Sequence, residues 1–163
     1  VELCDFLFLF NNLVMGSKFS SAAESSIAKK EVNDFISASI QENSVVFKSK
    51  DAAKFDSMWD KFWVEGAFMI RPSGNPLTKE SWREMVTAKD ISMESTELKS
   101  VDSVNLIAEG KVAVVTYTAH DKFSYKGTPN DDLAKFSGVL EKQADGAWKF
   151  VHLHRATGQS PPK

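Results

Sequence analysis

A single change in the spacing of its apolar residues constrains this chain more than any other feature. Between about residues 27 and 86, helical spacing of three to four residues dominates, with one strand-like segment at 63–70. From about residue 93 onward, runs rich in Val, Thr and Tyr are typical of strands. Helices followed by strands predict an α+β fold, in which the helices cover one face of an antiparallel sheet.

Caps and turns predict where these segments begin and end. Asp51 and Thr78 are residue types that cap helices, and each precedes a segment with helical spacing. A longer helix is expected first, over about residues 27–48. The strands are expected at about 93–108, 112–125, 134–143 and 148–157. Turns rich in Gly, Asp and Pro are expected at 72–76, 109–110, 126–132 and 145–146.

Size and charge exclude several classes of protein. The chain has 163 residues, enough for one domain, and its net charge of −2 leaves no basic excess for a dedicated nucleic-acid binder. The single Cys4 excludes an intrachain disulfide and a cysteine-rich zinc site. We predict a domain at 27–158, a disordered or loosely attached segment at 1–26, and a tail at 159–163.

The N-terminal segment is apolar but does not resemble a membrane span. Its run Phe6–Phe10 is far shorter than the roughly 20 residues needed to cross a bilayer, and no positive n-region precedes it. Residues 15–20, Met-Gly-Ser-Lys-Phe-Ser, match the N-myristoylation pattern if Met15 is the initiator. The alternatives are a chance match and a degraded targeting segment. We expect a cytoplasmic protein that meets a membrane only if Gly16 is myristoylated.

Three stretches resemble the nuclear transport factor 2-like superfamily. Residues 50–59, Lys-Asp-Ala-Ala-Lys-Phe-Asp-Ser-Met-Trp, resemble its short second helix, and residues 73–80 resemble the turn before its third helix. Residues 145–158, Asp-Gly-Ala-Trp-Lys-Phe-Val-His-Leu-His-Arg-Ala-Thr-Gly, resemble the closing motif of the calcium/calmodulin-dependent kinase II association (hub) domain. SnoaL-like polyketide cyclases and ketosteroid isomerases belong to the same superfamily.

The resemblance implies a cone-shaped, curved antiparallel sheet wrapped around N-terminal helices, a cystatin-like α+β roll. Its open mouth forms a pocket, and the back of its sheet commonly mediates dimers. We therefore expect a domain that binds a small molecule or mediates oligomerisation, and that forms a homodimer or a larger homo-oligomer. Its ligand is expected to be partly apolar, either neutral or anionic. The alternative is an isomerase, cyclase or dehydratase. A carbonic anhydrase of the iota type is a further alternative, but the tail at 152–157 lacks the serines of that motif.

Arg155 is the main ligand-binding candidate that the resemblance implies. It matches an arginine of the hub pocket, and a guanidinium in a cone requires either an internal carboxylate or an anionic ligand. The resemblance places Thr118 and His120 on the pocket side of their strand. Other hub arginines fall at Thr118 and near residues 137–138, so the hub's multi-arginine pocket is not reproduced.

Catalysis would need an acid or a base among the pocket residues. His120 can serve as either near neutral pH, or it can be a solvated residue at the sheet edge. An isomerase would need a carboxylate base and a hydroxyl donor, for which Asp60 and Tyr117 are the candidates. The alternative is that Asp60 is an ordinary solvated residue at a helix end.

His152 and His154 share one face of a predicted strand, because side chains alternate along a strand. They are either polar residues of the pocket or structure, or two ligands of a metal whose remaining ligands are not visible. We expect neither a metal nor a cofactor. Trp63 is expected in the core or at the mouth of the pocket, and Arg71 at the mouth or in solvent.

Overall fold

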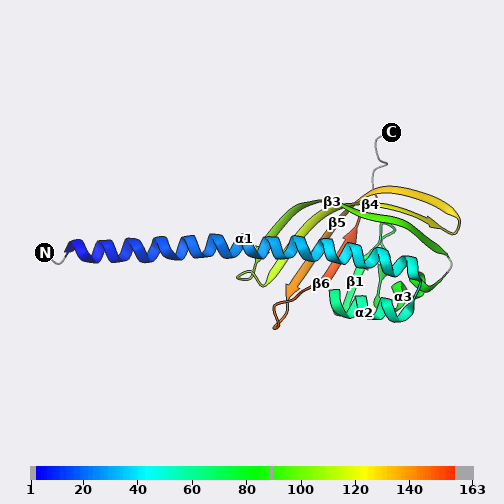
Figure 1. The fold of residues 1–163 in the computed structure, drawn as a ribbon, viewed down its shortest axis with the longest axis horizontal. Coiled ribbons are helices and arrows are strands. Elements are labelled where there is room, and N and C mark those ends of the chain that lie inside the picture. Colours follow the sequence, from blue (N-terminus) through cyan, green and yellow to red (C-terminus); the bar gives the residue numbers. More distant parts are fainter. Residues whose placement is uncertain (1–2, 89, 157–163) are drawn as a thin grey trace.

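A computed structural model of the chain describes residues 3–88 and 90–156, with side chains from Ala22 onward. Helices and strands follow one another as the sequence predicts, with helices mostly first (Figure 1). The elements are α1 (Leu3–Ser49), α2 (Ala52–Phe62), β1 (Trp63–Ile70), β2 (Pro76–Leu77), α3 (Lys79–Thr87), β3 (Ile91–Ile107), β4 (Val112–Tyr125), β5 (Thr128–Lys142) and β6 (Trp148–Arg155).

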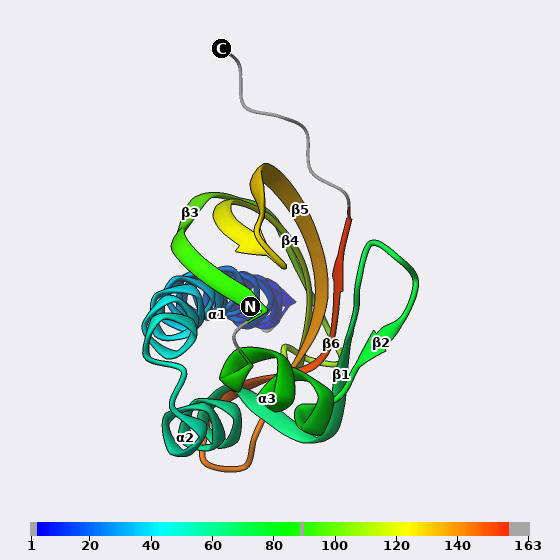
Figure 2. The same ribbon diagram turned by 90° about the vertical axis from the view of Figure 1, so that its right-hand side faces the viewer.

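In the described residues the strands form one sheet in the order β2-β1-β6-β5-β4-β3. Neighbouring strands are antiparallel except β1 and β6, which are parallel. In the chain, α3 and the four strands β2 to β5 lie between these two. The long strands β3, β4 and β5 curl around α1, so the concave face of the sheet is turned toward the helices (Figure 2). The predicted α+β class with a curved, open sheet is confirmed; the parallel pair is the one departure.

Local signals set the helix starts and the turns. The side chain of Asp51 accepts hydrogen bonds from two backbone N–H groups of α2, and Thr78 and Ser81 form a capping box at α3, as expected of these cap residues. The loop predicted at 126–132 is shorter than expected, since β5 already starts at Thr128. Lys126 and Gly127 both have positive φ, 50° and 81°, the geometry that a two-residue type I′ hairpin turn requires.

Helix α1 is longer than predicted, because it begins at Leu3 and not near residue 27. The Ser-rich stretch 17–26 contains no proline, and serine costs under about 0.7 kcal/mol per residue relative to alanine in a helix. The segment 1–26 was expected to be disordered or loosely attached, but its backbone is helical from Leu3 on; the domain boundary at 27 stays a prediction. Gly16 lies outside the residues whose side chains are described.

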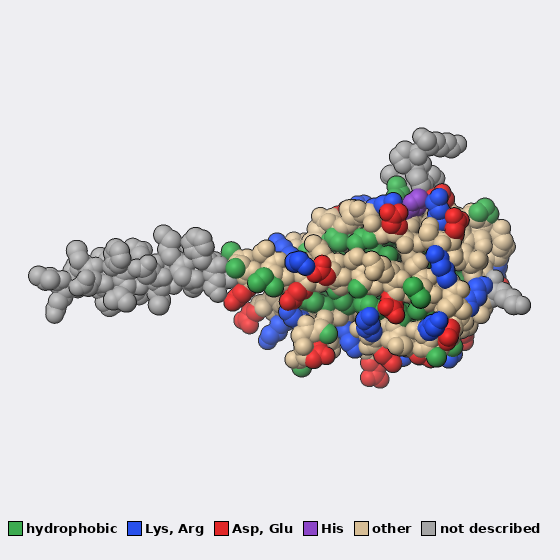
Figure 3. Space-filling view, in the orientation of Figure 1, with side chains coloured by type: hydrophobic (Ala, Val, Ile, Leu, Met, Phe, Trp, Pro, Cys, Tyr) green, Lys and Arg blue, Asp and Glu red, His purple; other side chains and the backbone are tan. Residues whose placement is uncertain are grey.

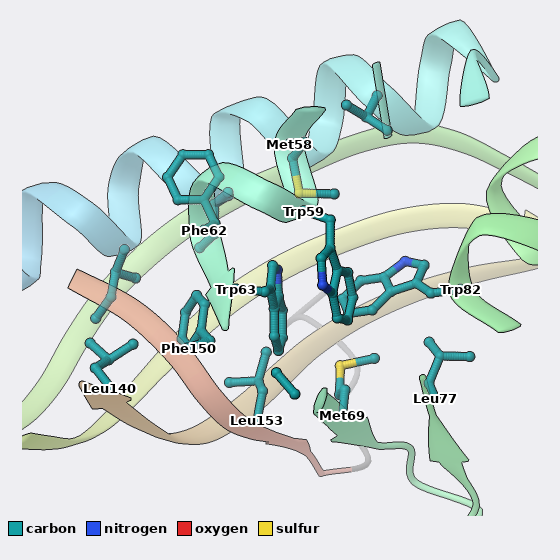
Figure 4. Packing of buried hydrophobic residues seen from close by; sticks show 14 of the residues in the cluster. Met58, Trp59, Phe62, Trp63, Met69, Leu77, Trp82, Leu140, Phe150 and Leu153 are labelled. Atoms are coloured by element: carbon teal, nitrogen blue, oxygen red, sulfur yellow. The ribbon is translucent and has the colours of Figure 1, made fainter. Parts of the chain in front are cut away.

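The core lies between the helices and the concave face of the sheet, with Trp63 at its centre (Figure 4). Its ring stacks on Trp59 with centroids 4.8 Å apart and planes 12° apart, and Phe150 lies 4.8 Å away on its other side. Trp82 of α3 meets Trp63 edge-on at 5.4 Å. Aromatic rings in such offset and edge-on contacts fix the position of α2 and α3 against β1 and β6.

The surface carries both signs of charge. On the face that Figure 3 shows, acidic and basic side chains are interspersed and form no single basic patch. None of the helices in the described part of the chain has the length of apolar sequence that crossing a membrane takes.

Candidate functional site

A cavity of about 280 Å³ opens between the concave face of the sheet, α1 and α3. Most of its lining is apolar and comes from every layer of the fold. The helices and the β1–β2 hairpin contribute Ile40, Phe47, Met69, Leu77 and Met85, and the long strands contribute Ile91, Met93, Ala119, Phe123 and Phe136.

Strand β4 presents its odd-numbered residues to the cavity. Tyr117, Ala119 and Asp121 are buried on the concave face, and all three line the cavity. The even-numbered residues therefore lie on the convex face, since strand side chains alternate. The prediction that Thr118 and His120 line the pocket is wrong: Thr118 bonds to Asp102 at 3.0 Å and His120 to Asp131 at 2.5 Å, both outside the cavity.

Arg155 does line the cavity, but its charge is already compensated. Its Nε and Nη2 donate to Oδ2 of Asp121 at 3.3 and 3.2 Å, and Nη2 also donates to Asp132 at 3.0 Å. Phe123 and Phe136 each place a ring 5.9 Å from the guanidinium carbon. Of the two partners predicted for Arg155, the internal carboxylate is the one that the structure shows.

A β-bulge in β6 decides which side chains of the closing motif face inward. The register with β5 shifts between Val139 and Leu140, where Val151 has no partner. Leu153 and Arg155 consequently point into the cone, whereas His152 and His154 share the convex face. The predicted common face of the two histidines is confirmed, but it is not the pocket face.

The two histidines are not placed to hold a metal with other described residues. Within residues 22–88 and 90–156, no group of three or more His, Cys, Asp or Glu side chains has a metal-binding arrangement. The ring of His152 lies 4.8 Å from that of Phe68, and its Nδ1 is buried without a hydrogen bond. His154 is exposed.

Tyr117 is a neutral hydrogen-bond donor in the cavity. Burial, and to a lesser degree the charge of Asp121, raises the pKa of its hydroxyl far above the ordinary value, so the phenol keeps its proton. Its ring stacks on Phe136 with centroids 4.8 Å apart and planes 6° apart. No other described residue hydrogen-bonds this hydroxyl.

The structure does not bring Asp60 and Tyr117 together. Asp60 is exposed at the end of α2, accepts a hydrogen bond from Lys79 at 2.8 Å, and lines a separate polar cleft with Trp63. Trp63 itself is only 2% exposed and belongs to the core, which is one of the two positions expected for it. Of the predicted catalytic residues, only Tyr117 lines the apolar cavity.

Three residues that line this cavity each have a buried polar atom for which the described residues supply no hydrogen-bond partner. These atoms are Oδ1 of Asn43, Nε of Arg71 and Nε1 of Trp82. Buried polar atoms are rarely left unpaired, because each costs about 1–3 kcal/mol. Arg71 thus lies at the pocket, as one of its two expected positions; Asn43 and Trp82 were not predicted as site residues, and neither was Asp121.

The sequence matches a family of proteins whose function is unknown. A family model described as "Protein of unknown function (DUF3804)" matches residues 38–161, which is more than half of the chain. No curated protein matches the chain.

Solved structures with a similar fold are numerous. A nuclear transport factor 2-like protein of unknown function from Prochlorococcus is 29% identical over 81% of this chain and 94% of its own, with a TM-score of 0.63. A nuclear transport factor 2-like superfamily protein from Salmonella enterica is 16% identical over 85% and 96%, with a TM-score of 0.61. ActVI-ORFA from Streptomyces coelicolor is 16% identical over 79% and 96%, with a TM-score of 0.56. The predicted nuclear transport factor 2-like fold is confirmed.

Proposed function

This chain belongs to the DUF3804 family of proteins of unknown function and has the nuclear transport factor 2-like fold, and we propose that its cavity binds a small, largely apolar organic molecule. The observation that carries the proposal is the combination of an apolar cavity with unpaired polar atoms in its wall. Ligand sites are typically concave and mostly apolar, with a few polar groups that orient the ligand.

The size and flexibility of the cavity limit what can enter it. Its volume of about 280 Å³ is close to the lower end of ligand pockets, which begin near roughly 300 Å³. Met69, Met85 and Met93 contribute flexible thioether side chains that adapt to the shape of a ligand. A molecule with one ring or a short branched chain fits these dimensions.

The contents of the cavity favour binding over catalysis. The predicted general base His120 lies on the convex face, and Asp60 lies at the surface. The carboxylate that does line the cavity, Asp121, accepts hydrogen bonds from Arg155 and Thr96 and so is held as an ion-pair partner. An isomerase, cyclase or dehydratase would need a free base at this place.

Native mass spectrometry of the freshly purified protein, followed by extraction of any bound molecule, tests the binding proposal. We expect an adduct of small mass, or, from protein freed of ligand, saturation-transfer NMR signals with single-ring fragments. A protein that carries no adduct and binds no member of a diverse fragment set would contradict the proposal.

We also propose that the convex face of the sheet forms a homodimer. The strand register aligns Val114, Val139, His152 and Phe68 in one row across four neighbouring strands. Val114 and Phe68 are each 37% exposed, and such exposed apolar groups at the centre of a sheet face are typical of interfaces. Light scattering of the purified protein tests this proposal; the predicted cytoplasmic location stays a prediction.

A further inference from the structure

We infer that the ligand of the cavity is a small apolar carboxylate, and that Arg71, not Arg155, binds its negative charge. This inference rests on the proposed function, because it specifies the chemical class of the molecule in the same cavity. The comparison of the two arginines carries it.

The positive charge of Arg155 is already compensated by two carboxylates of the protein. Two carboxylates, those of Asp121 and Asp132, already lie within 3.3 Å of its guanidinium nitrogens, and its side chain is only 14% exposed. A carboxylate ligand that approached Arg155 would meet two like charges. Repulsion between charges of one sign at such distances disfavours binding.

Arg71 is in the opposite situation. It lines the same cavity, its Nε is buried without a hydrogen-bond partner, and no described residue forms an ion pair with it. Leaving a guanidinium nitrogen buried and unpaired is costly, and a planar fork of N–H donors suits a carboxylate. An anionic ligand would supply the partner that the protein does not.

The backbone holds Arg71 in place at the mouth. It lies directly after β1, where its N–H donates to the carbonyl of Asn75 at 3.2 Å and its own carbonyl accepts from Gly74 at 2.8 Å. Pro72 follows and also lines the cavity. The arginine therefore extends from a closed hairpin turn and not from a long loop, which reduces the entropy lost when it binds a ligand.

Other polar groups of the wall suit an anion or a second polar group of the ligand. Trp82 offers an unpaired indole N–H, and the Tyr117 hydroxyl is a neutral donor without a partner. Asn43 adds an amide that can donate or accept, whichever way it is turned. A cationic ligand finds no comparable group among the described lining residues, because their one carboxylate, Asp121, is already paired with Arg155.

The test compares a carboxylate with its neutral amide of the same shape. We would measure the binding of 4-phenylbutanoate and 4-phenylbutanamide by isothermal titration calorimetry, using the full chain and two arginine variants. Arg71→Met removes the charge in the cavity. Arg83→Met is the matched control, since Arg83 of α3 pairs with Asp56 of α2 at 3.1 Å and does not line the cavity.

We expect the wild type to bind the carboxylate about tenfold or more tightly than the amide, the size of a charge-assisted hydrogen bond. Arg71→Met should abolish this preference, and Arg83→Met should retain it. Equal affinity of the wild type for both probes, or a preference that survives Arg71→Met, would overturn the inference but leave the proposed function intact. Failure of both probes to bind the wild type would count against the proposed function itself.

Discussion

Arg155 and Asp121 form a buried ion pair in which two nitrogens of one side chain contact one oxygen of the other, at 3.3 and 3.2 Å. The hydroxyl of Thr96 donates to the second oxygen of Asp121 at 2.7 Å, and Asp132 accepts from Arg155 at 3.0 Å. These four residues belong to β3, β4, β5 and β6. The contact therefore ties together the strands that form the curved wall of the cavity.

Replacing Arg155 with Met should destabilise the protein strongly. The variant leaves Asp121, whose side chain is 11% exposed, without a counter-charge in a low-dielectric environment. Removing one partner of a buried ion pair typically costs about 3–5 kcal/mol. The free energy of unfolding, measured by urea titration at neutral pH, should fall by roughly this amount.

The double variant Arg155→Met with Asp121→Asn provides the control. Because the asparagine carries no charge, the double variant should lose less stability than the two single variants lose when their losses are added. Additive losses would show that the two side chains stabilise the fold independently and would contradict the role of the pair.

Filling the cavity should abolish ligand binding. Ala119 lies at its wall and is 1% exposed, so Ala119→Leu places three additional carbon atoms inside the cavity. The change should lower the binding of a fragment such as 4-phenylbutanamide below detection by saturation-transfer NMR, while the thermal midpoint stays close to that of the wild type. If side chains already filled the space beside Ala119, the leucine would instead overpack the core and lower the free energy of unfolding by about 1–3 kcal/mol.

Thr118→Leu adds bulk to the neighbouring position on the convex face and is the matched control. We expect it to bind fragments as the wild type does. Loss of binding in both variants, or retained binding in Ala119→Leu, would show that the fragments occupy a different place.

The fold could be predicted because each signal was local. Asp51 and Thr78 cap helices through their own side chains, and the turns rest on neighbouring residues. The start of α1 could not be predicted this way, because serine lowers helix propensity only slightly and no proline or cap marks the start. A helix that is already nucleated extends through such a segment, since each added residue gains a hydrogen bond.

The site was harder to predict because it depends on which face of each strand points inward. In β4 the polar residues Thr116, Thr118 and His120 share a face, and this alternation alone indicates that the face is exposed to solvent. The residue-by-residue resemblance to the hub domain instead placed this face in the pocket. The inward position of Asp121 follows from the same alternation. The unpaired atoms of Asn43 and Arg71 depend on tertiary packing, for which a sequence pattern carries no signal.

Charging the row of side chains on the convex face should prevent dimerisation. Val114→Glu places a carboxylate beside Val139, at one end of the row, where a dimer interface would bury it at a cost. Multi-angle light scattering at micromolar concentration should show a dimer for the wild type and a monomer for this variant.

Val45→Glu is the control for added charge, since Val45 is 58% exposed on α1, away from the convex face. It should remain dimeric. A monomeric wild type, or a dimer that survives Val114→Glu, would contradict an interface on this face.

Acid should weaken a contact between β3, β4 and β5 that Asp102 forms. Burial tends to raise the pKa of this carboxyl, but hydrogen bonds from Lys135 at 2.6 Å, Ser100 and Thr118 outweigh it and hold the pKa below its usual range. A group whose pKa is lowered on folding stabilises the protein fully above its unfolded pKa, and this stabilisation is lost as the pH falls through the folded value. The free energy of unfolding should therefore decline between about pH 5 and pH 3.

Asp102→Asn should make this decline shallower, and Lys135→Met should do the same by removing the partner of Asp102. Urea titrations across this pH range measure the slopes, and curves that run parallel to the wild type in both variants would contradict the role of Asp102.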